Sequence, residues 1–383
     1  MRTVYKKGRL ITRLVPFAIL SLALSVTVAG PEPFGSEYQR GMIVPVVEGI
    51  AHPWAVGFLP DGRKLVTSRE GPIYLVENGN KTPLAGTPEV HVHNQGGLLD
   101  LVVHPDYERN GWIYMTYSRG DSSGTVPALA RARLKGERLT DLEVLFESNT
   151  VTSPGRHYGS RILFLDDGTL LMSIGDRGAQ PMRAQDPLDH SGSLVRLNMD
   201  GSVPDDNPFV GNDDYAPEIY SYGHRNIQGI VLHPETGEVW VTEHGPRGGD
   251  ELNLILPGRN YGWPVATLGR DYRTEEEFPD ARARHIEDME DPVFEFLPTL
   301  APSGLAVVTG ERFPAWQGNL LAGGLRAERV MRIRIEDQEV VHMEELFHGM
   351  IGRIRDVREG PDGTLYLLND RSDGGLYRIE PDG

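Results

Sequence analysis

The sequence predicts an all-β fold, a six-bladed β-propeller with four-stranded antiparallel blades. The chain has 45 glycines and 28 prolines among 383 residues, a turn-rich composition that favours many short strands. An X-Gly turn followed by a short apolar strand recurs six times from Gly62 to Gly363, at a mean spacing of about 60 residues. One such unit is too small to bury its own sheet, and radial stacking into a propeller solves this problem. A pair of β-sandwiches is the alternative, although sandwiches do not require this period.

Each copy of the repeat joins a turn glycine, which accepts positive φ, to the apolar residues of a strand. The copies are DGRKLVTSREG from Asp61, NGWIYMTY from Asn110, DGTLLMSIGDRG from Asp167, TGEVWVTEHG from Thr236, QGNLLAGGL from Gln317 and DGTLYLLND from Asp362. The apolar strand 40–50 is expected to complete a blade with the C-terminal strands and so close the ring. The segment 374–383 would be the last strand and tail.

Residues 1–30 are predicted to be an export signal, followed by a single propeller domain over residues 31–383. Five basic residues precede an apolar run from Leu14 to Val28, and small residues end it at Gly30. An uncleaved membrane anchor is the alternative, but the run is shorter than the roughly 20 residues that a spanning helix needs. The protein is therefore expected in the periplasm or outside the cell, with no membrane span once the signal is removed.

The charge and the absence of cysteine exclude several classes of function. The formal net charge is −17, and removing the five basic residues of the signal would bring it to −22. Nucleic acid and anionic membranes are poor partners for so acidic a chain, because both attract basic patches. Without cysteine, disulfides, thiolate metal sites and thiol nucleophiles are all impossible.

The longest intervals between copies of the repeat run from 168 to 237 and from 237 to 318, and we expect the extra length to form loops on one face that carries the site. Residues 243–264, EHGPRGGDELNLILPGRNYGWP, lie between them. Glycine-rich irregular backbone can turn carbonyls toward one point, and carboxylates follow closely. Such oxygen donors suit a hard cation such as calcium. A tight turn with a solvated acidic patch is the alternative.

A histidine and an aspartate are candidates for acid–base chemistry. His157 lies in a loop just before an apolar strand, and Asp176 follows the next strand of the same apparent hairpin. A loop histidine can serve as a general base, and a carboxylate can orient it. The two could equally be unrelated loop residues, because the spacing does not prove contact.

Cations cluster in three further segments. Arg225 and Asn226 lie in YSYGHRNIQGI, where the neighbouring His224 is better explained as a turn or blade-edge residue. Arg353 and Arg355 alternate in GRIRDVREG, so they share one face of a strand. A polyanionic ligand would explain that pair, and a salt bridge to Asp356 or Glu359 is the alternative. Arg326 is a further cation at the head of a strand.

Other motifs, present or absent, narrow the range of possible functions. His91 and His93 could form half of a zinc site, but no third ligand spacing is evident, so structural histidines are preferred. Gln95, beside two glycines, is better placed to touch a ligand. The sequence has no GxGxxG followed by a helix, no P-loop and no GxSxG, so nicotinamide, nucleotide and serine-hydrolase functions have no support.

Taken together, NQGGLLDLVVHPDY, RHYGSRILF, SYGHRNIQG, EHGPRGGDELNLI, NYGWP and RIRDV, in this order, resemble the soluble pyrroloquinoline quinone (PQQ) dependent aldose sugar dehydrogenases, relatives of soluble glucose dehydrogenase. The resemblance runs from about Val47 to Ile379. It implies a six-bladed propeller with PQQ on its top face and calcium beside it. The substrate would be an aldose sugar, oxidised at its C1 hydroxyl to a lactone, and the electrons would pass to an acceptor that the sequence does not identify.

The resemblance also assigns roles to residues of this chain. His157 resembles the catalytic base and Asp176 its partner, and Arg225 would add positive charge where hydride arrives. The cofactor-pocket residues would be Gln95, Arg225, Asn226, Tyr272, Arg326, Arg353 and Arg355. The carbonyls of Gly245 and Pro246 resemble ligands of a catalytic calcium, and Glu251 with the carbonyl of Tyr261 resembles the ligands of a second, structural calcium.

Two features qualify the resemblance. Arg326 stands where the family often has lysine, so a planar fork replaces a point donor there. The chain also lacks an obvious long insertion of the kind found in dimeric relatives, which implies a monomer. A metal-dependent lactonase propeller and a non-catalytic binding propeller remain alternatives. The first would need a central metal held by side-chain carboxylates and amides, and the second would bind no PQQ.

Overall fold

The computed structural model describes residues 1, 3 and 30–382. The predicted export signal, 1–30, therefore lies almost wholly outside the described residues. Within the described ranges, no helix combines the length and the apolar character needed to cross a membrane.

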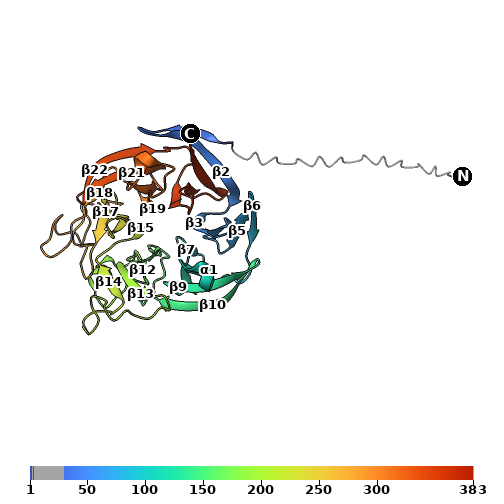
Figure 1. Ribbon diagram of the computed structural model, residues 1–383. Coiled ribbons are helices and arrows are strands. Elements are labelled where there is room, and N and C mark those ends of the chain that lie inside the picture. Colours follow the sequence, from blue (N-terminus) through green and yellow to red (C-terminus); the bar gives the residue numbers. More distant parts are fainter. Residues whose placement is uncertain (2, 4–29, 383) are drawn as a thin grey trace.

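Six antiparallel sheets stand around a central axis, as Figure 1 shows, and this confirms the predicted six-bladed propeller. Three four-stranded blades come first in the chain, and each begins with its innermost strand. They are β3 (Pro53–Phe58), β4 (Lys64–Ser68), β5 (Ile73–Glu77) and β6 (Asn80–Pro83); β7 (Leu98–Val103), β8 (Trp112–Asp121), β9 (Gly124–Lys135) and β10 (Arg138–Glu147); and β11 (Ile162–Phe164), β12 (Thr169–Ile174), β13 (Ser193–Asn198) and β14 (Ile219–Tyr222).

Two more four-stranded blades follow. They are β15 (Ile227–Leu232), β16 (Val239–Glu243), β17 (Asp250–Ile255) and β18 (Phe294–Phe296); and β19 (Pro302–Val307), β20 (Leu320–Gly324), β21 (Arg329–Glu336) and β22 (Glu339–Leu346). Short helical turns lie in the connections: α1 (Tyr107–Asn110), η1 (Pro181–Gln185) and η2 (Pro314–Trp316).

The last sheet closes the ring by joining the two ends of the chain, as the sequence predicted. It contains β23 (Ile354–Glu359), β24 (Leu365–Asn369) and β25 (Gly374–Pro381), with β2 (Arg40–Ile50) paired to β25 in the register Ile43↔Ile379. A short strand, β1 (Glu32–Gly35), pairs with the outer edge of β2 and makes this sheet five-stranded. Pairing β2 with β25 joins the N-terminal and C-terminal strands in one blade and so closes the ring.

The six copies of the repeat become the second strands of the six blades, β4, β8, β12, β16, β20 and β24. In the third copy, Gly168 takes φ 82°, and the Asp167 carboxylate accepts the amide N–H of Thr169 at 2.9 Å. The aspartate thus caps a turn that needs glycine at its second position. Apolar residues of adjacent blades then pack against each other, and Trp240 and Trp316 are fully buried between them.

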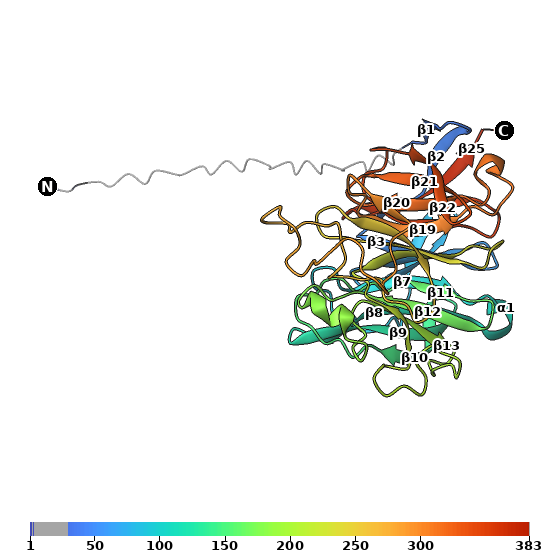
Figure 2. The ribbon, with the colours of Figure 1, turned by 90° about the vertical axis from the view of Figure 1, so that its left-hand side faces the viewer.

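The prediction that both long intervals form loops on one face is only half right. The segment after β17 starts near residues 208 and 209 and runs alongside β14 to the other end of the blade. From about residue 261 it lies on the same side of the disc as η1, and Figure 2 shows the disc in profile. Residues 199–218 instead join the turn at the other end of blade three, because Arg196 binds both Asp206 and the turn residue Asp167, at 2.8 and 2.7 Å. Each hairpin of a blade reverses the chain, so an insertion after β13 must lie at the end opposite to one after β12.

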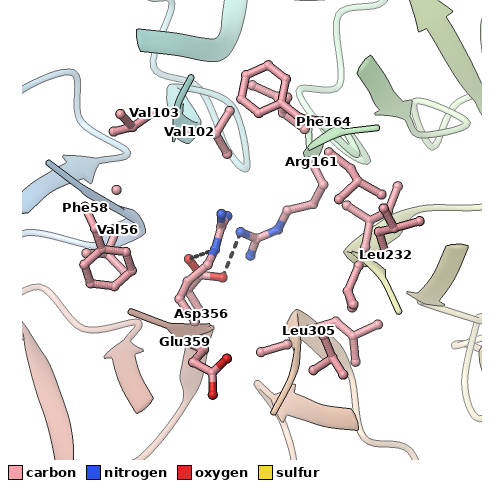
Figure 3. A pocket seen from close by; sticks show the side chains of 18 of the residues that line it. Val56, Phe58, Val102, Val103, Arg161, Phe164, Leu232, Leu305, Asp356 and Glu359 are labelled. Atoms are coloured by element: carbon pink, nitrogen blue, oxygen red, sulfur yellow. Dashed lines mark hydrogen bonds and ion pairs between the residues drawn. The ribbon is translucent and has the colours of Figure 1, made fainter. Parts of the chain in front are cut away.

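A buried ion-pair network fills the middle of the channel. Arg161 is 2% exposed and lies 2.9 Å from Asp356 and 3.6 Å from Asp100. Its guanidinium also lies over the Trp54 ring, 4.1 Å from the centroid. Beyond it the channel opens into a cavity of about 430 Å³, shown in Figure 3, whose wall includes Phe58, Phe164 and Leu305. The network therefore separates this far cavity from the other end of the channel.

Candidate active site

A polar cleft of about 630 Å³ opens at the end of the channel where the inner strands begin. All six blades contribute lining residues, among them Trp54, Leu99, His157, Arg225, Leu325 and Arg355. The volume is typical of a small-molecule site. Blade closure therefore brings together residues that are separated by more than three hundred positions in sequence, such as Trp54 and Asp370.

His157 and Asp176 are in contact within this cleft. The Nδ1 atom of His157 lies 2.6 Å from a carboxylate oxygen of Asp176, and the two side chains are 14% and 1% exposed. Burial lowers the pKa of His157, and the positive charges of Arg225 and Arg177 lower it further, against the opposing effect of Asp176. Burial alone would raise the pKa of Asp176, but His157 and Arg225 outweigh it and lower the pKa. Both directions favour a neutral imidazole beside an ionised carboxylate.

The backbone around His157 is held in an unusual conformation. His157 has φ 45°, a left-handed value that non-glycine residues adopt mainly where surrounding structure imposes it. Its amide N–H donates to the side-chain oxygen of Gln95 at 2.8 Å. A side chain at Gly175 would collide with the carbonyl oxygen of His157, so only glycine allows β12 to approach this loop. The glycine of the SIGDRG segment thus sets the distance between the base and its carboxylate.

A third residue, which the sequence analysis did not identify, completes this pair. The indole N–H of Trp263 donates to the second carboxylate oxygen of Asp176 at 2.8 Å, and the Gly178 amide donates to the first, also at 2.8 Å. Trp263 also lies 5.3 Å from the Arg225 guanidinium and 4.7 Å from the Phe278 ring. Both oxygens of Asp176 are therefore fixed by donors, which sets the orientation of His157.

Arg225 and Asn226 lie beside this pair, at the start of the next blade, and are mostly buried; the Asp176 amide donates to the Arg225 carbonyl at 2.8 Å. Arg225 donates to the carbonyl oxygen of His244 at 3.1 Å, while its Nε atom is buried and has no partner within the described residues. The side-chain oxygen of Asn226 accepts the Gly159 amide at 3.0 Å. Burial, with Arg225 and His157 nearby, lowers the pKa of His244 to about 3. His244 therefore stays neutral, and Arg225 is the buried cation beside the pair.

Arg353 and Arg355 both face the cleft, as their alternation predicted, but their acidic partner was not foreseen. Asp370 lies 2.8 Å from Arg355 and 3.4 Å from Arg353, and it also binds His52 at 2.9 Å. Burial would raise the pKa of Asp370, and these cations lower it well below its usual range. A single carboxylate cannot accept from every N–H group of two arginines. The Nε atom of Arg355 is buried and has no hydrogen-bond partner in the described chain.

The salt bridge to Asp356 or Glu359, considered as an alternative for this pair, is therefore wrong. Asp356 binds Arg161 and Arg358, at 2.9 and 3.1 Å, on the far side of the channel. Glu359 accepts the amide N–H groups of Thr309 and Gly310. The strand pattern could not reveal Asp370, because that residue comes from the neighbouring strand of the sheet.

The remaining predicted cofactor contacts lie at the rim or outside it. Gln95 and Tyr272 line the cleft, and Tyr272 is 61% exposed. Arg326 is exposed, and only its neighbour Leu325 belongs to the lining that the described residues form. Three arginines that were not predicted, Arg69, Arg156 and Arg273, also line the cleft. Arg156 could have been suspected because it precedes His157 directly.

The glycine-rich turn after β16 packs closely beside the cleft. Gly245 and Pro246 are buried and follow His244, which lines the cleft. The carboxylate of Asp250 accepts the Gly245 amide at 3.0 Å and the Ala301 amide at 2.7 Å. Burial raises the pKa of Asp250 despite these donors. Since the amide of Gly245 is taken, its carbonyl is the backbone group left available to a ligand.

Glu251 lies on β17, one strand further from the propeller axis than β16. It pairs in register with Glu243 on β16 and Glu295 on β18, so three glutamates lie side by side across three strands. Burial, followed by the charges of Glu243 and Glu295, raises the pKa of Glu251 well above its usual value. Asn253 donates to both Glu243 and Glu251, at 2.9 and 3.1 Å. Like charges at this spacing favour a bound proton or cation.

Tyr261 belongs to the same region. Its ring stacks on His224 at 4.5 Å, and His224 in turn binds Glu243 at 2.9 Å. His224 is fully buried, which confirms that it has a structural position. His91 and His93 lie with ring centroids 6.2 Å apart. Between residues 30 and 382, side chains of His, Asp and Glu form no group of three or more that is placed to hold a metal ion by itself.

These features define an all-β propeller with an arginine-lined cleft around a histidine–aspartate pair. The model of the glucose/sorbosone dehydrogenase family matches residues 50–378, so the chain belongs to that family and is an oxidoreductase of the sugar dehydrogenase type. The aldose sugar dehydrogenase YliI of Escherichia coli is 38% identical over 96% of this chain and 98% of its own length. An uncharacterised protein of Synechocystis is 43% identical, and the match covers 88% of this chain and 86% of that protein.

Solved structures agree with this assignment. The PQQ-bound form of the aldose sugar dehydrogenase from Streptomyces coelicolor superposes with a TM-score of 0.73 and 28% sequence identity. The match covers 92% of this chain and 100% of that one. The comparison thus places this propeller beside one that holds a quinone cofactor.

Proposed function

We propose that this protein is a PQQ- and calcium-dependent aldose dehydrogenase that oxidises the C1 hydroxyl of a sugar to a lactone. One observation carries the proposal: a neutral His157 shares a cleft with two buried arginines, Arg225 and Arg355, whose Nε atoms have no partner among the described residues. A buried donor without a partner is costly unless a ligand satisfies it. The PQQ-bound relative supports the choice of ligand.

The residues present fit PQQ. The cofactor carries three carboxylates, and guanidinium groups are the donors best suited to carboxylates. Arg225, Arg353 and Arg355 would hold them, with Gln95 and Asn226 adding amide contacts and Tyr272 closing the rim. Arg326 stays part of the proposal as an outer contact, since its exposed side chain would have to extend toward the cofactor.

The residues also fit calcium. The carbonyls of Gly245 and Pro246 are oxygen donors next to the cleft, and calcium prefers mixed carbonyl and carboxylate oxygen. Glu251, with the carbonyl of Tyr261, would hold the second ion, and the neighbouring Glu243 and Glu295 add negative charge there. Glu295 is already paired with Arg284, and a divalent cation would relieve the remaining repulsion between Glu251 and the buried Glu243.

When bound, PQQ supplies an ortho-quinone that accepts hydride, and calcium beside it increases its electrophilicity. His157 removes the proton from the C1 hydroxyl. Its Nδ1 is engaged by Asp176, so Nε2 is the nitrogen left to receive the proton. Asp176 then stabilises the imidazolium that forms. Arg225 contributes positive charge near the reacting carbonyl oxygen.

The lactonase alternative is less well supported by the channel itself. A central metal would need carboxylates and amides pointing to the axis, whereas Arg161 occupies that position and already binds Asp356 and Asp100. Hydrolysis of a lactone without PQQ would favour this alternative. The non-catalytic alternative leaves the partnerless arginines unexplained, and it requires that PQQ does not bind.

The deciding experiment is reconstitution. Apo-protein is loaded with PQQ and calcium and assayed with an artificial electron-acceptor dye over a broad aldose panel. We expect dye reduction with at least one aldose and a lactone product. Dye reduction with none of the sugars, from protein shown by absorbance titration to hold PQQ, would refute the proposal.

Calcium has its own test. Added calcium should raise the thermal midpoint of the wild-type protein, because an ion that binds only the folded state stabilises it. Glu251→Gln should lose most of that calcium-dependent rise, while Glu235→Gln, which changes an exposed glutamate elsewhere, should keep it. An equal calcium response in both variants would contradict the second site.

Export, a monomeric state and an unidentified electron acceptor complete the proposal. The basic and apolar N-terminal segment supports export to the periplasm or beyond. Detection of a mature N-terminus near residue 31 in secreted material would test this. Light scattering of the purified protein would test the monomer.

A further inference from the structure

With the proposed cofactor and calcium both bound, the cleft would still carry a net positive charge. Six arginines line it against three aspartates, an excess of three positive charges in a chain whose formal net charge is −17. The arginines are Arg69, Arg156, Arg225, Arg273, Arg353 and Arg355, and the aspartates are Asp176, Asp271 and Asp370. A three-carboxylate cofactor would balance this excess, but the calcium ion beside it would restore positive charge. The loaded cleft would thus remain attractive to an anion.

The six arginines fall into two groups. Arg225, Arg353 and Arg355 contact protein oxygens and are the proposed cofactor donors. The side chains of Arg69, Arg156 and Arg273 make no hydrogen bond or ion pair with any residue in 30–382. Elsewhere on the surface, exposed arginines commonly find an acid: Arg119 binds Glu147, Arg247 binds Glu275 and Arg371 binds Asp373. Arg40, Arg138 and Arg282 show that an exposed arginine elsewhere can also lack a partner within the described chain. Arg69, Arg156 and Arg273 differ from them in position, because they line the same cleft as the catalytic pair.

Two of the partnerless arginines flank the catalytic pair. Arg156 precedes His157, and a side chain at Gly178 would touch both the Arg156 stem and the His157 ring, within 3.2 and 3.3 Å. Arg273 comes from the long excursion after β17, whose Phe278 packs on Trp263, the residue bound to Asp176. Both arginines are exposed, whereas Arg225 and Arg355 are buried. The exposed pair therefore lies at the mouth, where a substrate enters after the cofactor is in place.

We propose that the substrate is an aldose carrying an anionic group, a carboxylate or a phosphate, at the end of the sugar remote from C1. Arg156 and Arg273 receive that group, and Arg69 adds positive charge to the same cleft. Guanidinium forks suit both anions, because each offers paired oxygens. This inference rests on the proposed function and specifies its substrate.

The chemistry at C1 is unchanged by the anionic group. The C1–H bond breaks and its hydrogen leaves as hydride to the bound quinone, which gains two electrons. The hydroxyl proton goes to His157, and a C1=O double bond forms in the lactone. The carboxylate or phosphate takes no part in the reaction and only fixes the sugar in the cleft, which favours a productive approach.

The test uses the PQQ- and calcium-loaded enzyme and matched sugar pairs. Galacturonate is compared with galactose, glucuronate with glucose, and glucose 6-phosphate with glucose, all by dye reduction. We expect at least one charged sugar to exceed its neutral partner about tenfold in kcat/KM at low salt. Added salt should reduce this ratio, because both arginines are exposed and screening weakens their attraction. The pair that shows the effect identifies carboxylate or phosphate as the preferred group.

Variants then test whether Arg156 and Arg273 cause the preference for charged sugars, measured as the ratio of kcat/KM for a charged sugar to that for its neutral partner. Arg156→Gln and Arg273→Gln should each reduce the charged-to-neutral ratio several-fold, while Arg119→Gln, outside the cleft, should leave it unchanged. Because the ratio is measured on one preparation, partial misfolding does not affect it. If the loaded enzyme oxidises neutral sugars at least as well as charged ones, and no variant changes the ratio, this inference is overturned and the proposed function stands. If it oxidises no sugar, both fail.

Discussion

The two ends of the propeller channel use arginines of one strand, β23, in opposite ways. Arg358 faces the far cavity and lies 2.5 Å from Asp100 and 3.1 Å from Asp356, both of them buried. Arg355, three residues earlier, faces the cleft, shares Asp370 with Arg353 and keeps a buried Nε atom without a partner in the described chain. At the far end both arginines, Arg161 and Arg358, are paired with buried aspartates. At the cleft end, the Nε atoms of Arg225 and Arg355 have no hydrogen-bond partner in the described chain.

This difference separates stability from function along a single axis. Figure 3 shows the matched end, where largely apolar side chains surround the ion pair between Asp356 and Arg161. Asp356 also pairs with Arg358. Buried ion pairs are costly to break, because removing one partner leaves an uncompensated charge. Unsatisfied donors, by contrast, are costly until a ligand arrives, so they are expected where a ligand binds. Four substitutions, two at each end, test this division.

The largest effect is expected at His157. His157→Ala should lower kcat by about a thousandfold, within the range that a general base contributes, and leave PQQ affinity nearly unchanged. In the wild type the acid limb of kcat should lie below the ordinary histidine value, because burial lowers the pKa of His157 and the base works only when neutral. Activity should then persist to lower pH than a solvent-exposed histidine would allow. Turnover of the variant close to that of the wild type would remove His157 from the mechanism.

Asp356→Ala should have the largest effect at the matched end. It leaves Arg161 and Arg358 with the single carboxylate of Asp100 between them, and we expect the free energy of unfolding to fall by about 3–5 kcal/mol. Denaturant titration of the apo-protein measures this without the added stabilisation from bound ligands. PQQ affinity, measured at a temperature where the variant remains folded, should change little. A loss of affinity with unchanged stability would reverse the division between the two ends.

The sequence predicted what depends on local pattern. The X-Gly turns located the second strand of every blade, and alternation correctly placed Arg353 and Arg355 on one face. The pairing of His157 with Asp176 could be inferred as a possibility, since both precede or follow strands of one hairpin, and their contact confirms it. In each case the interacting residues lie within one blade, so strand geometry is enough.

Partners from other elements could not be predicted. Trp263 reaches Asp176 from a segment 87 residues away, and Glu295 reaches Glu251 across an excursion of about forty residues. Their contacts depend on how the excursion after β17 crosses the neighbouring blade, and local pattern carries no information about that path. The position of Arg326 was missed for a similar reason. Its exposure follows from where the turn after β20 ends, and the strand pattern does not show this.

Trp263→Phe should have a moderate effect at the cleft end. It keeps an aromatic ring against Phe278 but removes the N–H donor to Asp176. The carboxylate then binds a proton more strongly and raises the pKa of His157, so the acid limb of kcat should move to higher pH. We also expect kcat to fall about tenfold, as for the loss of one hydrogen bond to a charged group, with KM changed less. Phe278→Leu, which keeps the donor, is the control.

A merely structural role for Trp263 would give a different result. Lost packing would lower the thermal midpoint and change kcat and KM together, with the pH profile unmoved. An unshifted acid limb in Trp263→Phe would therefore show that the indole N–H does not tune the base.

The smallest effect is expected at the wall of the far cavity. Val103 is partly exposed there, and Val103→Phe would extend into an open space of about 430 Å³. Because that cavity lies beyond the Arg161 network, kcat/KM and PQQ affinity should stay within about twofold of wild type, and the cost in stability should be under the 1–3 kcal/mol typical of overpacking a closed core. Leu325→Phe, a comparable enlargement in the wall of the cleft, should weaken PQQ binding instead. If Val103→Phe reduced turnover while the ion-pair network stayed intact, the two ends of the channel would be coupled, and the separation inferred from their charges would fail.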